Sequence, residues 1–454
     1  MSEEQKKPLS KKEGQLKRNL TLFEATIYSI SFLIGTGIFL KPSTVLANSG
    51  STALSLILWI AGGLLAMCSA LTMAEIAAYI PKLGGMYTYI IELWGDRLGF
   101  MFGWINMLIV GPAGCAASAI AFATFASYFV PFTNSGLKIL SIVMIIFFAV
   151  IQIISTKATM KLQVIGTIGK LIPIFAIVLF GLFRGEIPGA INFSLVGGSA
   201  AKGYGIALLG ILWAYDGWQA TCQLGSEMVK SEKNLPKAII ISLTFVIIVY
   251  AIFNVIIFKL IPADQVISNN GQSVGIEALQ VLFGKIGAGL GSIGMLISSA
   301  TTLNAQMISS VRITLAFAKK KQTIGSNFLG HVSPKFDTPI NSILFSVVVI
   351  IIYILSGTFD SVTNLTIFAG WIFFVVTVLG IFKLRKVYKR NENLYHVPLY
   401  PIIPIVGAVG GSYLLISTLF EDPKTALISI GLLLIGLPMY YYCKKKYHNG
   451  ENVK

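Results

Sequence analysis

The sequence predicts an all-α integral membrane protein with twelve transmembrane helices. Only 12% of its 454 residues are charged and 55% are hydrophobic, whereas a soluble domain carries about 25% charged residues. Apolar runs of the roughly 20 residues that cross a bilayer alternate with short polar segments along the chain. The 44 glycines also suit the close helix packing that is typical of membrane proteins.

The twelve apolar runs give the order of the elements. Their centres lie near Gly35, Ala66, Pro112, Ile146, Phe175, Tyr215, Val249, Ser299, Val348, Trp371, Gly410 and Leu433. Residues 1–19 are polar and contain no cleavable apolar segment, so we expect a cytoplasmic tail and no signal peptide. The regions that follow are helices 1–5 (20–184), helices 6–10 (203–386), helices 11–12 (400–443) and a cytoplasmic C-terminal tail (444–454).

The basic residues predict the orientation of the chain. Most of the 35 lysines and arginines fall in segments on the same side of the twelve spans as the N-terminus. Those expected on the opposite side are Lys41, Lys138, Arg184, Lys202, Lys259, Lys285 and Lys424. By the positive-inside rule, we expect a multi-pass protein of the plasma membrane with both termini in the cytoplasm. The net charge of +16 therefore reflects orientation in the lipid bilayer, and no nucleic-acid partner is expected.

Neither a disulfide framework nor a metal site is indicated. Of the four cysteines, Cys68, Cys115 and Cys222 lie in apolar runs, and no CxxC pair occurs. The three histidines fall in expected cytoplasmic segments, where solvation explains them. No catalytic triad or phosphate-binding loop stands out, so we expect no cofactor and no enzymatic activity.

The first span is interrupted at its middle. An apolar run from Leu20 to Ala47 contains Gly35, Thr36 and Gly37. Each glycine weakens a helix by about 1 kcal/mol relative to alanine. A membrane helix that opens at this depth exposes backbone groups that lipid cannot satisfy, so the opening must face protein, water or a ligand. We therefore expect a substrate site here.

Polar residues in the second and third spans are further candidates. Glu75 lies about two turns before Pro81, near the expected cytoplasmic surface. We interpret it as an interfacial carboxylate that closes the cytoplasmic side. Asn106 precedes the kink expected at Gly111-Pro112 in the third span.

Lys170 lies inside the fifth span, which we expect from Leu162 to Phe183. Its position corresponds to a depth of about 12 Å at a rise of 1.5 Å per residue. A lysine side chain that extends toward the surface covers only about half of that distance. A charge at mid-membrane costs about 2.5–3.5 kcal/mol, so we expect an internal ammonium group with a functional role.

The sixth span is also interrupted. Its apolar first half runs to Trp213 and Ala214 and stops at Tyr215, Asp216 and Gly217. Asp216 could contact a cationic substrate, or it could cap the second half-helix, which is the interpretation we favour.

The seventh and eighth spans add two polar candidates. Tyr250 lies in the seventh span and Asn304 in the eighth. Asn304 could face a cavity, and hydrogen bonding between helices explains it equally well.

Two interrupted helices in corresponding positions indicate a transporter site in an inverted repeat. A half-helix that begins after a break offers free N–H groups and a positive dipole end, which suit a carboxylate. A half-helix that ends before a break offers carbonyl groups, which suit an ammonium group. A zwitterionic α-amino acid carries both groups on one carbon, and it is the ligand class that the two breaks predict.

The chain resembles the L-amino acid transporter family of the amino acid–polyamine–organocation superfamily, and bacterial serine–threonine and alanine–serine–cysteine exchangers in particular. The stretches that carry the resemblance are SFLIGTGIFLKP, AEIAAYIPKLGGMYTYI, TIGKLIPI, WAYDGW and VPLYP. The resemblance implies a five-plus-five inverted repeat, with helices 1 and 6 broken, followed by two further helices.

The resemblance also implies roles for the residues at the breaks. The substrate carboxylate would meet the backbone at Thr36 and Gly37, and its amino group would meet carbonyls near Leu33, Trp213 and Asp216. Trp213 would be an aromatic gate. The expected substrate-binding set is Leu33, Gly35, Thr36, Gly37, Trp213, Ala214, Tyr215, Asp216 and Gly217.

Two further implications concern coupling and partners. In sodium-independent members a lysine of the fifth span occupies the cation site of sodium-coupled relatives, and Lys170 matches that lysine. Animal members bond to an accessory glycoprotein through a cysteine between spans three and four. The segment VPFTNSGLK has no cysteine there, so we expect no disulfide-linked heavy chain and a bacterial source.

The predicted function is sodium-independent exchange of small neutral L-amino acids, such as alanine, serine, cysteine and threonine, by alternating access. The preference for small substrates follows from the bulk of Trp213 and Tyr215. Proton-coupled symport of neutral or cationic amino acids is an alternative, suggested by Asp216 and Glu75. A membrane sensor or channel is a third hypothesis. We find no added soluble domain that would support a sensor.

Overall fold

The computed structural model describes residues 20–80, 85–154, 166, 169–184, 203–223, 228–268, 273–334, 336 and 338–448. Within these residues the chain is helical, and β-structure is limited to two isolated bridges. The prediction of an all-α membrane protein is confirmed. Most of the polar segment before the fifth span lies outside the described residues, as do both ends of the chain.

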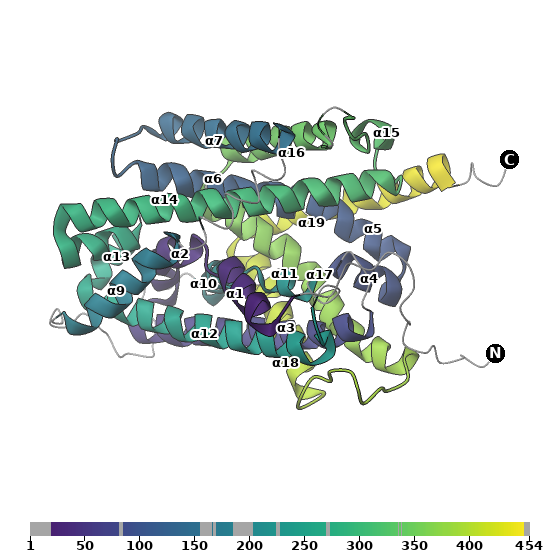
Figure 1. Ribbon diagram of the computed structural model, residues 1–454, viewed down its shortest axis with the longest axis horizontal. Coiled ribbons are helices and arrows are strands. Elements are labelled where there is room, and N and C mark those ends of the chain that lie inside the picture. The colour runs from purple at the N-terminus through teal and green to yellow at the C-terminus, as the bar shows by residue number, and fades with distance from the viewer. Residues whose placement is uncertain are drawn as a thin grey trace.

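Long apolar helices form most of the molecule (Figure 1). Among the described residues, eight are long enough to cross a bilayer: α3 (Thr52–Tyr79), α5 to α6 (Asp96–Ala126), α7 (Asn134–Ile154), α12 (Ser231–Leu260), α14 (Val274–Lys319), α17 (Phe359–Val387), α18 (Ile402–Glu421) and α19 (Pro423–Cys443). The pair α1 (Leu22–Leu33) and α2 (Gly37–Ser49) passes the same test as one bent span.

Three shorter apolar helices occupy the remaining predicted spans: α9 (Leu171–Phe183), α10 (Tyr204–Ala214) and α16 (Ile340–Ser356). Every predicted centre falls within one of these helices or at a break between two of them. The number of helices that cross the membrane, twelve, stays a prediction.

Small elements connect or extend the long helices. They are α4 (Met86–Trp94), α11 (Trp218–Gln223), α13 (Ala263–Ser268), α15 (Ser326–Leu329) and the π-helix η3 (Lys444–His448). The rod from Asp96 to Ala126 is itself composite, with α5 (Asp96–Ile105), a π-helical turn η1 (Asn106–Val110) and α6 (Gly111–Ala126). Because Pro112 has no N–H to donate, the helix cannot keep its regular hydrogen bonds there, and the turn widens at the predicted kink.

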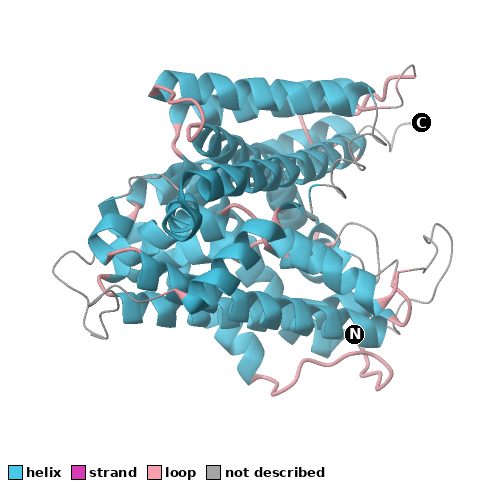
Figure 2. Cartoon of the chain, turned by 60° about the vertical axis from the view of Figure 1, so that its left-hand side comes forward, coloured by secondary structure: helices cyan, strands magenta, loops and turns pink. Residues whose placement is uncertain are grey.

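Two groups of packed helices make up the molecule. Helices α6, α7, α14 and α16 share a separate apolar cluster that includes Cys115, Phe148, Met307 and Ile350, and they lie along one side in both views (Figures 1 and 2). The larger cluster joins α1, α2, α3, α10, α12 and α17. Since α6 also contacts α17, the two groups are in direct contact.

The surface of the outermost helices is apolar, as lipid requires. On α7, the side chains of Ile139, Val143, Phe147 and Val150 are exposed, whereas the opposite face, which includes Phe148, is buried. This one-sided burial places α7 at the edge of the bundle. The broken helices α1, α2, α10 and α11 lie instead among the other helices near the centre (Figure 1).

Candidate functional site

The first span breaks where its glycines predict. Helix α1 ends at Leu33, residues Ile34 to Thr36 are not helical, and α2 begins at Gly37 with its axis turned by 50°. The last hydrogen bond of α1 runs from Ile34 N–H to the Ile30 carbonyl. The carbonyls of Ser31 and Leu33 come after that bond and are available to side chains from elsewhere.

The sixth span breaks in the predicted place as well. Helix α10 ends at Ala214, Tyr215 to Gly217 form a turn, and α11 begins at Trp218. Gly217 has a φ of +118°, in the left-handed region that disfavours side chains. The prediction that both spans are broken is therefore confirmed.

The two breaks lie directly against each other. A Cβ added to Gly37 would be 2.7 Å from the Cα of Ala214. A Cβ added to Gly217 would be 2.9 Å from the carbonyl oxygen of Phe32. At each of these glycines, the backbone of the other broken span comes close. Neither glycine can therefore be replaced by a larger residue unless the backbone moves.

Tyr250 of α12 connects the ends of both half-helices. Its hydroxyl lies 3.0 Å from the Leu33 carbonyl oxygen and 3.2 Å from the Ala214 carbonyl oxygen, and its side chain is fully buried. One hydroxyl proton is shared between two acceptors. The Leu33 carbonyl, which we expect to receive a substrate ammonium group, is thus linked to the Ala214 carbonyl by this tyrosine. Its spacing along the chain gave no sign of the contact.

Lys170 contacts the first break from the other side. It precedes α9, is buried, and donates a hydrogen bond from Nζ to the Ser31 carbonyl. This carbonyl is one of those that the break leaves without a helical bond. The part of the predicted span before Gly166 lies outside the described residues, so the depth expected for Lys170 is not tested.

Thr36 is the N-cap residue of α2. It makes no capping hydrogen bond with its side chain, and its buried Oγ1 has no hydrogen-bond partner among the described residues. The first N–H groups of a helix also lack partners within the helix. Together they form a set of donors next to Gly37, at a positive helix end.

The aromatic residues beside the sixth-span break point in two directions. The Trp213 ring lies 6.3 Å from that of Phe359 in α17. The Tyr215 ring packs against Trp59 and Tyr250, at 6.1 and 5.1 Å. Tyr215 therefore extends toward α3, and its effect on substrate size stays a prediction.

Asp216 is held by a neighbour in its own turn. Gln219 Nε2 donates to Asp216 Oδ1 at 3.0 Å, and Gln219 Oε1 accepts from the Gly217 N–H at 3.1 Å. A further bond of 2.6 Å joins Ser29 in α1 to Thr221 in α11. Gln219 and Thr221 were not among the predicted residues, although both lie in the first turn of α11, directly after Asp216.

The eighth span borders the site at the first break. A Cβ added to Gly35 would be 3.9 Å from Thr302 Oγ1 on α14, which places α14 along the first break. Asn304 on the same helix is fully buried, and Asn106 in η1 is nearly so. A substrate-binding role for these two asparagines remains a prediction.

Glu75 lies in a salt-bridge network near the C-terminal end of α3. Arg385 of α17 binds it with two hydrogen bonds, of 2.8 and 2.9 Å, and the Val397 N–H donates to it at 2.6 Å. The guanidinium group of Arg385 also lies 3.7 Å from the centre of the Tyr400 ring. These contacts join the ends of α3 and α17, and the closing of the cytoplasmic side by Glu75 stays a prediction. Nothing in the sequence indicated Arg385 as its partner.

Comparison with known proteins identifies the family. The family model described as "Amino acid permease" matches residues 20–441, which include both breaks and Lys170. The chain belongs to the amino acid permease family. It is a multi-pass membrane protein of a family of transporters, and not an enzyme.

Individual relatives agree over nearly the whole chain. The permease is 37% identical to the serine/threonine exchanger SteT of Bacillus subtilis (strain 168), over 96% of this chain and 98% of that protein. It is 28% identical to the human large neutral amino acids transporter small subunit 2, over 94% of this chain and 80% of the relative. It is also 28% identical to the human cystine/glutamate transporter, over 96% of this chain and 87% of the relative. The resemblance inferred from the sequence is confirmed.

Proposed function

We propose that the permease is a sodium-independent antiporter of small neutral L-amino acids that works by alternating access. The observation that carries this proposal is the apposition of the two breaks. One side offers the buried Thr36 hydroxyl and the start of α2, and the other offers the last carbonyls of α1 and α10. An α-amino acid carries groups that are complementary to both, a carboxylate for the donors and an ammonium group for the carbonyls.

The chemistry assigns a role to each helix end. The carboxylate would accept hydrogen bonds from the N–H groups at Thr36 and Gly37, with Gly35 keeping the approach open. The ammonium group would donate to carbonyls near Leu33, Trp213 and Asp216. The Tyr250 hydroxyl shares the Leu33 and Ala214 carbonyls, so substrate binding would change its hydrogen bonds as well.

Sodium independence is supported by Lys170. Its ammonium group already donates to the Ser31 carbonyl beside the first break. When protonated, Lys170 disfavours a bound cation there by repulsion, and its hydrogen bond keeps the end of α1 in place without one.

The choice of substrate rests on two arguments. Trp213 lies at the end of α10 beside the breaks and limits the space for a side chain. The relative with 37% identity is named for serine and threonine exchange. The names of the human relatives refer to large neutral amino acids and to cystine and glutamate, so the side-chain pocket varies within this group.

The proposal extends to topology and partners. Both termini would lie in the cytoplasm, and the protein would act in the plasma membrane without a disulfide-linked heavy chain or a cofactor. The two carboxylates that suggested proton coupling are both engaged, Glu75 with Arg385 and Asp216 with Gln219. This engagement favours exchange over proton-coupled symport.

The test is counterflow in proteoliposomes. Vesicles preloaded with unlabelled alanine or serine should take up labelled serine several-fold faster than empty vesicles, and replacing sodium by choline should leave the rate unchanged. Equal uptake into empty and preloaded vesicles would contradict exchange. Accumulation driven by a pH gradient into empty vesicles would support the symport alternative.

A further inference from the structure

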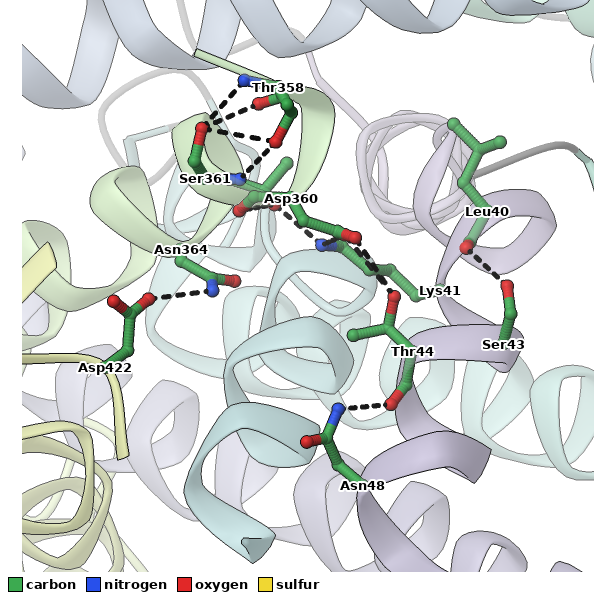
Figure 3. A network of polar contacts seen from close by, with 11 residues as sticks. Leu40, Lys41, Ser43, Thr44, Asn48, Thr358, Asp360, Ser361, Asn364 and Asp422 are labelled. Atoms are coloured by element: carbon green, nitrogen blue, oxygen red, sulfur yellow. Dashed lines mark hydrogen bonds and ion pairs between the residues drawn. The ribbon is translucent and has the colours of Figure 1, made fainter. Parts of the chain in front are cut away.

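Lys41 is a fully buried lysine that the proposed substrate site does not use. It lies in α2, one turn beyond Gly37. Its Nζ is 2.5 Å from Oδ1 of Asp360 and 2.7 Å from Oγ1 of Thr363, both in α17 (Figure 3). The sequence places Lys41 and Asp360 far apart, and nothing in the sequence predicted their contact.

The side chain of Lys41 joins three helices. A Cβ added to Gly210 would be 3.3 Å from Lys41 Cδ, so the aliphatic part of the lysine crosses α10 at a glycine. Asp360 lies in the first turn of α17, where it also accepts a hydrogen bond from Thr44 of α2 at 3.3 Å. The lysine thus holds α2 and α10 against the beginning of α17. Figure 3 shows its contact with Asp360 of α17.

The network lies close to Trp213. The Lys41 ammonium group is 4.9 Å from the centre of the Phe359 ring, and that ring contacts Trp213 edge to face at 6.3 Å. A movement of α17 away from Lys41 would therefore also uncover Trp213, on the side of the site expected to face outside.

The two charges differ in their access to water. The Lys41 side chain is 0% exposed, whereas the Asp360 side chain is 47% exposed. A buried ammonium group needs its carboxylate partner, because water does not replace it while the helices are packed together. If the helices separate, both ions become hydrated and the pair is no longer required. The strength of this contact therefore depends on conformation.

We propose that Lys41 and Asp360 form a latch that closes the extracellular side of the permease, with Thr363 as its second support. The latch is engaged when α2 and α10 pack on α17, and it is broken when the outer pathway opens. This inference rests on the proposed alternating-access transport, but its test does not require transport.

The test measures access to a reporter cysteine. Asp360, Thr363 and Ile367 are spaced along one face of α17, and Ile367 is buried, deeper than the latch. In a background without Cys68, Cys115, Cys222 and Cys443, Ile367→Cys is labelled with a membrane-impermeant thiol reagent added outside. Asp360→Asn should raise the labelling rate about tenfold, as expected for a shift in the conformational equilibrium of about 1.4 kcal/mol.

Three further variants make the test specific. Asp360→Glu keeps the carboxylate and should restore a rate near that of the parent. Thr363→Val removes only the second partner of Lys41 and should give a smaller increase in the labelling rate. This variant keeps the latch testable if Asp360→Asn does not fold. Asp264→Asn is the matched control, because Asp264 also lies in the first turn of a helix, is exposed and is not a hydrogen-bond partner of Lys41.

The outcomes distinguish a failure of the latch proposal from a failure of the proposed function. Unchanged labelling in both Asp360→Asn and Thr363→Val would overturn the latch, even if the parent exchanges amino acids in proteoliposomes. Faster labelling of the Asp360→Asn variant, together with a parent protein that fails to exchange amino acids, would support the latch and reject the proposed antiport.

Discussion

At the scale of single residues, the site consists of backbone carbonyls that lack a helical hydrogen bond at a helix break. It also includes the side chains that donate hydrogen bonds to these carbonyls. Ser31 and Leu33 follow the last helical bond of α1, and their carbonyls are taken by Lys170 and Tyr250. A charged donor on a buried carbonyl contributes about 1.5–3 kcal/mol. Loss of either contact should therefore affect the shape of the break more than the fold.

Lys170→Ala should lower the rate of serine exchange about tenfold or more, because the hydrogen bond of a charged donor is lost from the end of α1. The protein should still reach the membrane and elute as a folded species in detergent. The matched control is Lys259→Ala, since Lys259 also donates to helix-end carbonyls, at Gly181 and Leu182, but away from the breaks. Unchanged exchange kinetics in Lys170→Ala would remove the lysine from the mechanism.

Gly37→Ala should destabilise the protein by about 1–3 kcal/mol, because the added methyl group meets backbone of Ala214 that cannot rotate away. Thermal unfolding in detergent measures the loss, and exchange should fall with it. Gly431→Ala in α19 is the control, since an added Cβ there meets nothing within 4 Å. A melting temperature equal to that of the parent would mean that the breaks are not in tight contact.

At the scale of elements, the end of α3 is attached to α17 by a salt bridge between a fully buried carboxylate and a partly exposed guanidinium group. Breaking a buried pair costs about 3–5 kcal/mol, and the partial exposure of Arg385 reduces that value. Helices α3 and α17 thus meet through a charged pair near the end of α17. Near its beginning, α17 contacts α2 through Lys41.

Glu75→Gln should lower thermal stability in detergent by several degrees, because Arg385 loses its ionic partner. Glu392→Gln is the matched control. Glu392 pairs with Arg390 in the open, with both side chains at least 70% exposed, and such a pair contributes at most about 1 kcal/mol. A Glu75→Gln protein with normal stability that no longer responds to a pH gradient would instead point to proton coupling.

Local patterns in the sequence were sufficient for part of this architecture. Glycine clusters inside apolar runs predicted both breaks, and Gly111-Pro112 predicted the distortion in the third span. Each of these signals lies within a few residues of its consequence. The family resemblance then supplied the role of Lys170, which spacing alone could not.

Contacts between segments that are far apart in the chain could not be predicted from the sequence. Lys41 was grouped with the residues expected outside, because a topology argument assigns a side of the membrane and not a packing partner. Its burial depends on α17, more than 300 residues later. Tyr250 was a subordinate candidate for the same reason, since its two acceptors belong to different helices. Tyr215 was expected beside the substrate and packs toward Trp59.

At the scale of the whole molecule, the first broken span is secured at two places by two buried lysines. Lys170 holds the end of α1, and Lys41 holds α2 against α17. In the proposed orientation, Lys41 closes the outer end of this span, and the Glu75–Arg385 pair holds α3 and α17 together at the opposite end. In alternating access the openings of the two ends are coupled, so that one end stays closed while the other is open. The permease could then exchange one amino acid for another many times while the ion gradients of the cell are preserved.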